Sequence, residues 1–256
     1  MFVVTSHYNE DLHWLEDSKY PVVVIDKEGA APTCLSVRTI IPNRGREASS
    51  FLRYIIDHYD NLPSHIAFIH GHETAWHQKR PFRMIDMINN VRLTDDIFVS
   101  FNGTFEVCKI EQHSSDVVQI KRNWDIIKPW VGPIPEGNGM TDVGAQFIVS
   151  RNRIRRHPKK AYQTWYDALM SQDGQKKSAI ICDPTVKCNI DYELSVFFEY
   201  TWHYIFGEPW VMEPKSFFNY RLFSRERLPS KSFVESKPIF IQEKDRLFEA
   251  LKNVMS

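Results

Sequence analysis

The sequence predicts an α/β fold with a mostly parallel central sheet and helices on both faces of that sheet. Two observations lead to this prediction. Strand-like and helix-like segments alternate over the first 70 residues, and the second strand-like segment, PVVVID, carries consecutive β-branched residues, as a strand covered on both faces does. Such alternation is typical of parallel strands joined by crossover helices. We expect one domain over residues 1–208 and a C-terminal extension over residues 209–256.

The first part of the chain contains three of the expected strands, at residues 2–5, 21–26 and 66–69. A helical turn is expected over residues 11–16. A longer helix is expected before the third strand, because apolar residues recur there at helical spacing and Pro63 lies beyond its end. These apolar residues are Phe51, Leu52, Ile55, Ile56 and Tyr59.

The rest of the chain is less regular. Further strands are expected at residues 96–100, 106–110 and 145–150, and helices at residues 158–170 and 191–207. Residues 128–144 are rich in proline and glycine and are predicted to form a long loop, of a length typical of binding loops or disordered segments. The extension is expected to end in a helix over residues 243–255 that packs on the domain.

The composition narrows the class of protein. Lysine plus arginine equals aspartate plus glutamate at 32 each, so an overall basic field for nucleic acid is absent, and we expect no nucleic-acid partner. No apolar run approaches the length of a membrane span, and the N-terminus does not resemble a signal peptide. The four cysteines form no C-x-x-C pair. These features predict a cytoplasmic protein without a membrane span.

Polar residues follow each of the first three predicted strands. They are Ser6–Asp11, Asp26–Glu28 and His70–Glu73. In an open α/β sheet, ligands bind outside the carboxyl ends of the parallel strands. We therefore expect these three segments to line one binding site.

The segment His70-Gly71-His72 has a spacing that suits a metal ion. In an extended chain, both imidazoles point the same way, and with Glu73 or His77 they could hold zinc or manganese. The alternative interpretation is that one histidine packs in the core and the other is a surface donor.

Two further patterns could carry chemistry. Arg44 and Arg46 flank a glycine just before a predicted helix, and a helix N-terminus with guanidinium groups suits a phosphate. A solvated turn is the alternative. Glu199 and His203 are four residues apart on an aromatic-rich helix, where Glu199 could act as a partly buried acid or base. A surface pair of little energetic value is the alternative. Trp76 lies in a loop and could stack on a sugar, and packing in the core is the alternative.

Several motifs together resemble an uncharacterised family, domain of unknown function 3431, over residues 3–208. They are YNEDLHWL, PNRGREASSFLRYIIDHYDNLP, FIHGHETAWH, GAQFIVSRNRI and EYTWHYIFG. The resemblance implies no activity by itself.

The order of these motifs is also similar to that of nucleotide-sugar glycosyltransferases of the GT-A fold, a Rossmann-like α/β fold. This resemblance implies transfer of a hexosyl or pentosyl group from a nucleotide-sugar donor to an unknown glycan or glycoprotein acceptor. It implies that Glu199 is the catalytic base, with His203 beside it. The residues that it implies for donor binding are Tyr8, Asn9, Glu10, Asp26, Arg44, Arg46, Trp76 and Gln146.

The chain departs from the GT-A pattern at the metal site. No D-x-D motif occurs, and His70-Gly71-His72 stands at the corresponding position. A divalent cation, Mn²⁺ or Mg²⁺ rather than Zn²⁺, is therefore an open prediction at His70 and His72. Two alternatives stay open. One is a metal-dependent hydrolase built on His70, His72 and His77, and the other is a non-catalytic protein that binds carbohydrate or nucleotide.

Overall fold

The computed structural model describes the chain except residues 76, 79–81, 104, 111–119, 172–191 and 213–256. A six-stranded sheet with the order β3-β2-β1-β4-β8-β5 forms its centre. The strands are β1 (Phe2–His7), β2 (Val22–Lys27), β3 (Val37–Ile41), β4 (His65–His70), β5 (Phe98–Ser100) and β8 (Phe147–Ser150). Strands β1 to β4 are parallel, whereas β8 runs antiparallel to both of its neighbours. The prediction of a mostly parallel sheet is confirmed.

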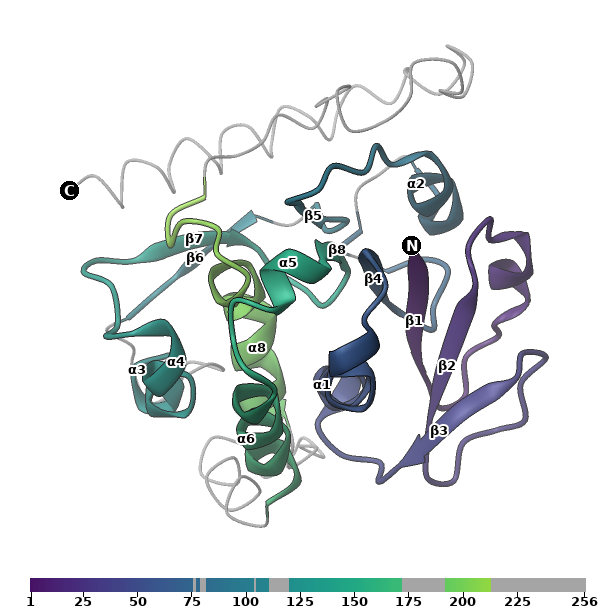
Figure 1. Cartoon of the computed structure of the whole chain (residues 1–256), viewed down its shortest axis with the longest axis horizontal. Helices are drawn as coiled ribbons and strands as arrows, with labels where there is room; N and C mark the ends of the chain where they lie inside the picture. The colour runs from purple at the N-terminus through teal and green to yellow at the C-terminus, as the bar shows by residue number, and fades with distance from the viewer. Residues whose placement is uncertain (76, 79–81, 104, 111–119, 172–191, 213–256) are drawn as a thin grey trace, which may run out of the picture.

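A second, two-stranded antiparallel sheet joins β6 (Phe105–Cys108) to β7 (Gly139–Asp142) and lies away from β1, β2 and β3 (Figure 1). The α-helices are α1 (Arg46–His58), α2 (Met84–Asn90), α3 (Ile120–Asn123), α4 (Lys128–Val131), α5 (Arg151–Ile154), α6 (Lys159–Met170) and α8 (Tyr192–Ile205). The 3₁₀ helices are η1 (His13–Asp17), η2 (Tyr59–Asn61) and η3 (Trp124–Ile126).

Two hydrophobic cores lie on opposite faces of the central sheet. Along β4, Phe68 belongs to one core and Ile69 to the other, as alternation in a strand requires. The larger core packs β4 against α1, α6 and α8, and it is rich in aromatic side chains. The smaller core packs the sheet against η1 and α2. Helices therefore cover both faces, as predicted from the buried character of the strands.

Some elements differ from the prediction. The prediction of one long loop over residues 128–144 is wrong, because this segment contains α4 and strand β7. Strand β7 pairs with β6, which is distant in sequence, so its local composition did not reveal it. The edge strand β3 and the short helix α2 were also not predicted. The predicted helix at 243–255 lies outside the described residues.

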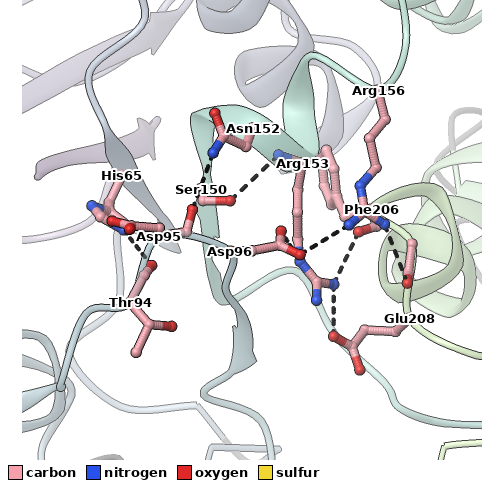
Figure 2. A network of polar contacts seen from close by, with 11 residues as sticks. His65, Thr94, Asp95, Asp96, Ser150, Asn152, Arg153, Arg156, Phe206 and Glu208 are labelled. Carbon is pink, nitrogen blue, oxygen red and sulfur yellow. Dashed lines mark hydrogen bonds and ion pairs between the residues drawn. The ribbon is translucent and has the colours of Figure 1, made fainter.

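A polar network ties several elements together near the amino end of β4 (Figure 2). The Arg153 guanidinium at the start of α5 donates to Asp96 at 2.9 Å, to Glu208 at 2.6 Å and to the Phe206 carbonyl at 3.0 Å. Arg156 contacts the same Asp96 carboxylate at 3.0 Å. This network holds the end of α8 against β8 and the segment that precedes β5. It lies at the opposite edge of the sheet from the polar strand ends.

Within the described ranges, none of the helices has the length and apolar character needed to cross a membrane.

Candidate functional site

The polar ends of β1, β2 and β4 lie side by side. In the parallel register, His7 of β1 is opposite Asp26 of β2, and Ser6 is opposite His70 of β4. The strand order also reverses here, since β2 and β3 lie on one side of β1 and β4 lies on the other. Such a switch point opens a crevice at the carboxyl ends of the strands. We call the polar segments that follow β1, β2 and β4 at this edge the strand-end site. They are Ser6–Asp11, Asp26–Glu28 and His70–Glu73.

A histidine that the sequence interpretation did not single out anchors the β2 end of the strand-end site. The buried His7 ring places Nδ1 at 2.7 Å from an Asp26 carboxylate oxygen and Nε2 at 3.2 Å from the Glu10 carbonyl. Both ring nitrogens therefore face oxygen acceptors. These two contacts fix the orientation of the ring and tie the end of β1 to β2 and to the loop that follows β1.

Glu10 closes the loop after β1 against the loop after β4. Its carboxylate accepts hydrogen bonds from the backbone amides of Tyr8 at 2.6 Å and Asn9 at 3.1 Å. The same side chain lies 3.7 Å from Nε2 of His72. Gly71 makes this approach possible, because a Cβ there would lie 2.9 Å from the Glu10 Cβ. The glycine of the His-Gly-His segment is thus explained by close packing.

The N-terminus of α1 carries a left-handed turn. Gly45 has φ +67°, and Arg46, which is not a glycine, has φ +44°. A left-handed residue with a side chain costs of order 1 kcal/mol or more, so the surrounding contacts must enforce it. The buried Lys27 supplies one of these contacts, because its ammonium donates to the Arg44 carbonyl at 2.9 Å.

The turn sends its two arginines in different directions. The Arg44 guanidinium donates to the Met170 carbonyl at the end of α6, at 3.2 Å. The Arg46 guanidinium instead lies 3.6 Å from the Glu199 carboxylate on α8. Of the two predicted phosphate contacts, Arg46 is the one that the structure brings to another predicted site residue.

Glu199 of α8 is poised to exchange a proton near neutral pH. Burial and the nearby Glu47 carboxylate raise its pKa to about 7, although Arg46 acts in the opposite direction. Its side chain keeps 17% of its surface exposed, so a ligand could reach it. A carboxyl group with this pKa can serve as a general base or acid. The sequence prediction of a partly buried carboxyl with a raised pKa is therefore matched by its surroundings.

Glu47 and His70 extend the polar group from α1 to β4. Their facing atoms, a Glu47 carboxylate oxygen and Nδ1 of His70, are 3.8 Å apart. Burial lowers the pKa of His70, although the nearby Glu47 carboxylate acts in the opposite direction. Burial alone would raise the pKa of Glu47, but His70, Arg46, a backbone amide and Lys27 together lower it. Glu47 was not among the predicted site residues, because its contact with β4 depends on the tertiary fold.

A second layer of amides lies beside His70. The rings of His70 and His77 are 5.2 Å apart, and Nδ1 of His77 is 2.8 Å from the Asn102 side-chain oxygen. Asn102 in turn donates to the Gln146 backbone carbonyl at 3.3 Å. Asn102 was missed by the sequence interpretation, since an isolated asparagine carries no local signal.

Gln146 is fully buried, yet its side-chain amide is unpaired among the described residues. The Nε2 atom of His70 is likewise buried without a described partner. An unpaired buried polar group costs about 1 to 3 kcal/mol, so native proteins keep few of them, often at functional sites. Both residues were predicted site residues, and these atoms are the ones that a bound ligand could satisfy.

Four predicted site residues remain to be placed, which are His203, Tyr8, Asn9 and Trp76. His203 is buried on α8, where its ring nitrogens approach the Thr141 hydroxyl at 2.9 Å and the Trp210 carbonyl at 3.4 Å. The first of these contacts joins α8 to β7, and the catalytic role of His203 stays a prediction. Tyr8 and Asn9 are exposed at the strand-end site. Trp76 lies outside the described residues.

The predicted metal site at His70 and His72 has a weak geometric basis. His72 faces Glu10, and His70 faces Glu47. Within the described residues, the side chains whose ligand atoms gather as a set of three within 4.8 Å are His13, Glu16 and Cys34. The histidines at 70, 72 and 77 do not form such a set as they stand. A cation there stays a prediction, and the hydrolase alternative gains no support.

Comparisons with known proteins add one finding. Neither the curated proteins nor the solved structures contain a match to this chain. A family model described as "Protein of unknown function (DUF3431)" matches residues 2–220, which is most of the chain. The protein therefore belongs to the DUF3431 family.

Proposed function

We propose that this protein is a glycosyltransferase with a GT-A-like fold, which transfers a sugar from a nucleotide-sugar donor to an acceptor hydroxyl. The observation that carries the proposal is the position of Glu199. A carboxyl group with a pKa of about 7 lies 3.6 Å from the Arg46 guanidinium, next to the N-terminus of α1 and close to the ends of the parallel strands. A base and an anion-binding group beside a topological switch point suit a reaction with an anionic leaving group.

The donor would use the groups that favour negative charge. The diphosphate would bind the Arg46 guanidinium and the N-terminus of α1, where the helix dipole is positive. Asp26, which keeps a second carboxylate oxygen beyond its contact with His7, would accept from a ribose hydroxyl. Gln146 and His70 would pair their unsatisfied atoms with the sugar.

In the reaction, Glu199 takes the proton of the acceptor hydroxyl. The acceptor oxygen forms a bond to the anomeric carbon, the bond from that carbon to the phosphate oxygen breaks, and its electron pair leaves with the nucleoside diphosphate. Arg46 has a second effect. It lowers the pKa of Glu199 in the free protein, so its movement toward the diphosphate would make Glu199 a stronger base once the donor is bound.

The test separates binding from chemistry. Thermal unfolding is followed with UDP-, GDP- and TDP-sugars, with and without Mn²⁺, and nucleoside diphosphate release is measured for any sugar that stabilises the protein. We expect one donor to raise the unfolding temperature, Arg46→Gln to abolish that shift, and Glu199→Gln to keep it while slowing turnover at least about 100-fold.

The control is Asp60→Asn, which changes an exposed carboxylate on η2, before β4, and should leave both readouts as in the wild type. The absence of a shift with every donor tested would contradict the proposal. A donor-dependent shift with turnover unaffected by Glu199→Gln would instead identify a non-catalytic binding protein.

A further inference from the structure

A separate group of potential metal ligands lies outside the strand-end site. The ligand atoms of His13, Glu16 and Cys34 all lie within 4.8 Å of one another. Facing atoms of His13 and Glu16 are 3.6 Å apart. All three side chains are exposed. We call these three residues the His13–Cys34 cluster.

The first two ligands are held by a short, well-anchored helix. His13 and Glu16 are three residues apart on η1, and side chains at this spacing stand one above the other on a 3₁₀ helix. Leu12 and Leu15 are buried in the smaller core. Trp14 donates from its indole nitrogen to the Gly71 carbonyl at 2.9 Å. Burial and this bond keep the imidazole and the carboxylate on the same exposed side.

The third ligand comes from the connection between β2 and β3. Two anchors hold this connection beside the loop that leads to η1. The Ala31 amide donates to the Tyr8 carbonyl at 2.7 Å, and Leu35 packs against the smaller core. Cys34 lies between these anchors and is exposed with a free thiol. Two segments that are separate in sequence therefore bring their donor atoms together. The ion pair between His13 and Glu16 accounts for these two side chains, but it does not account for the position of Cys34 beside them.

From this geometry we infer that the His13–Cys34 cluster binds Zn²⁺. A thiolate, an imidazole and a carboxylate form a mixed ligand set that suits zinc, whereas Mg²⁺ and Ca²⁺ prefer oxygen alone. Ligand atoms in a tetrahedral zinc site lie roughly 3 to 4 Å apart, so exposed side chains spread over 4.8 Å need only small rotations to close on the ion. Exposure leaves the fourth position to water. Binding would release the Cys34 proton.

Cobalt titration of untagged full-length protein tests the inference. Co²⁺ takes the place of Zn²⁺ in such sites, and a cysteine ligand gives a sulfur-to-cobalt charge-transfer band in the near ultraviolet. We expect this band to saturate at about one Co²⁺ per chain and to disappear when one equivalent of Zn²⁺ is added. Cys34→Ser should remove the band, and His13→Gln and Glu16→Gln should weaken Co²⁺ binding at least about tenfold, because loss of even an outer partner costs that much.

His72→Gln distinguishes the His13–Cys34 cluster from the predicted cation site at His70 and His72, and it should leave the titration unchanged if the cluster holds the ion. Three results would overturn the inference, and the first two concern the charge-transfer band. One is the lack of a band with wild-type protein at micromolar Co²⁺. The other is a band that persists in Cys34→Ser, which would assign the metal to the other cysteines of the chain. Loss of cobalt binding in His72→Gln alone would place the ion at the strand-end site instead.

Discussion

At the scale of single residues, the protonation of Glu199 links the strand-end site to stability. The folded state raises the pKa of this carboxyl from its ordinary value of 4.5 to about 7. Between these two values the folded state holds a proton that the unfolded state has lost. The free energy of unfolding therefore falls as the pH rises through this range.

The variant Glu199→Gln should remove this decrease in the free energy of unfolding with rising pH. At pH 5 the wild type is protonated, so the neutral amide should change the free energy of unfolding little. At pH 8 the amide should stabilise the protein relative to the wild type by at most about 3 kcal/mol, the cost of ionising the buried carboxyl. Urea denaturation at half-unit pH steps measures the difference. A difference that does not change between pH 5 and pH 8 would show that Glu199 does not titrate in this range, and Glu28→Gln serves as the exposed control.

The contact between His7 and Asp26 shows how a predicted binding residue can also be structural. Asp26 was predicted to hold the donor, yet one of its oxygens already faces the buried His7 ring at 2.7 Å. Removing one member of such a pair leaves the other group buried without its partner, which is costly.

We expect Asp26→Ala to lower the free energy of unfolding by about 2 to 3 kcal/mol, because it leaves the buried His7 ring without this hydrogen-bond partner. Urea denaturation at neutral pH gives this value. Glu28→Ala, an exposed carboxylate two positions further along, should change it by less than about 0.5 kcal/mol. Equal effects of the two variants would argue against the buried pair.

At the scale of elements, α1 and α8 position the side chains of the candidate site. The network around Arg153 in turn holds α8 in place. Helix α1 brings Arg46 and Glu47 to the strand ends, and α8 brings Glu199 to Arg46. The far end of α8 is held by Arg153, whose guanidinium contacts Glu208 at 2.6 Å and the Phe206 carbonyl at 3.0 Å (Figure 2). Both charged side chains of the Arg153–Glu208 pair are only 12% exposed.

Replacement of Arg153 by methionine should therefore remove the 2.6 Å ion pair that Arg153 makes with the largely buried Glu208. We expect Arg153→Met to lower the free energy of unfolding by about 3 kcal/mol, the lower end for a broken buried pair. Chemical denaturation measures this loss. The matched control is Arg92→Met, because Arg92 is exposed and should tolerate the same change with an effect below about 0.5 kcal/mol. A small effect of Arg153→Met would mean that the network is a surface feature.

At the scale of the whole molecule, one sheet separates two cores and collects the polar groups at one edge. The larger core lies under α1, α6 and α8, and the smaller core lies under η1 and α2. The polar ends of β1, β2 and β4 meet because three neighbouring strands run in the same direction. The strand-end site is therefore a consequence of the sheet order, whereas the His13–Cys34 cluster depends on two loops that cover the smaller core.

The sequence was sufficient where a local pattern carries the information. The β-branched run PVVVID and the apolar spacing from Phe51 to Tyr59 indicated a buried strand and a crossover helix, which are β2 and α1. From these, we expected Asp26 and the segment at His70 to lie at the same end of the sheet, because parallel strands end at one edge. The segment PNRGRE also indicated Arg46 as a site residue, because its glycine marks a turn before a helix.

Only the tertiary structure decided which distant groups face each other. The contacts of Glu47 with His70 and of Arg46 with Glu199 join elements far apart in the chain, and no periodicity encodes them. The same holds for β7, whose residues form a strand because β6 lies beside them. Local patterns report how a segment buries its own surface, whereas pairing, pKa values and ligand sets depend on what the packed chain places next to that segment.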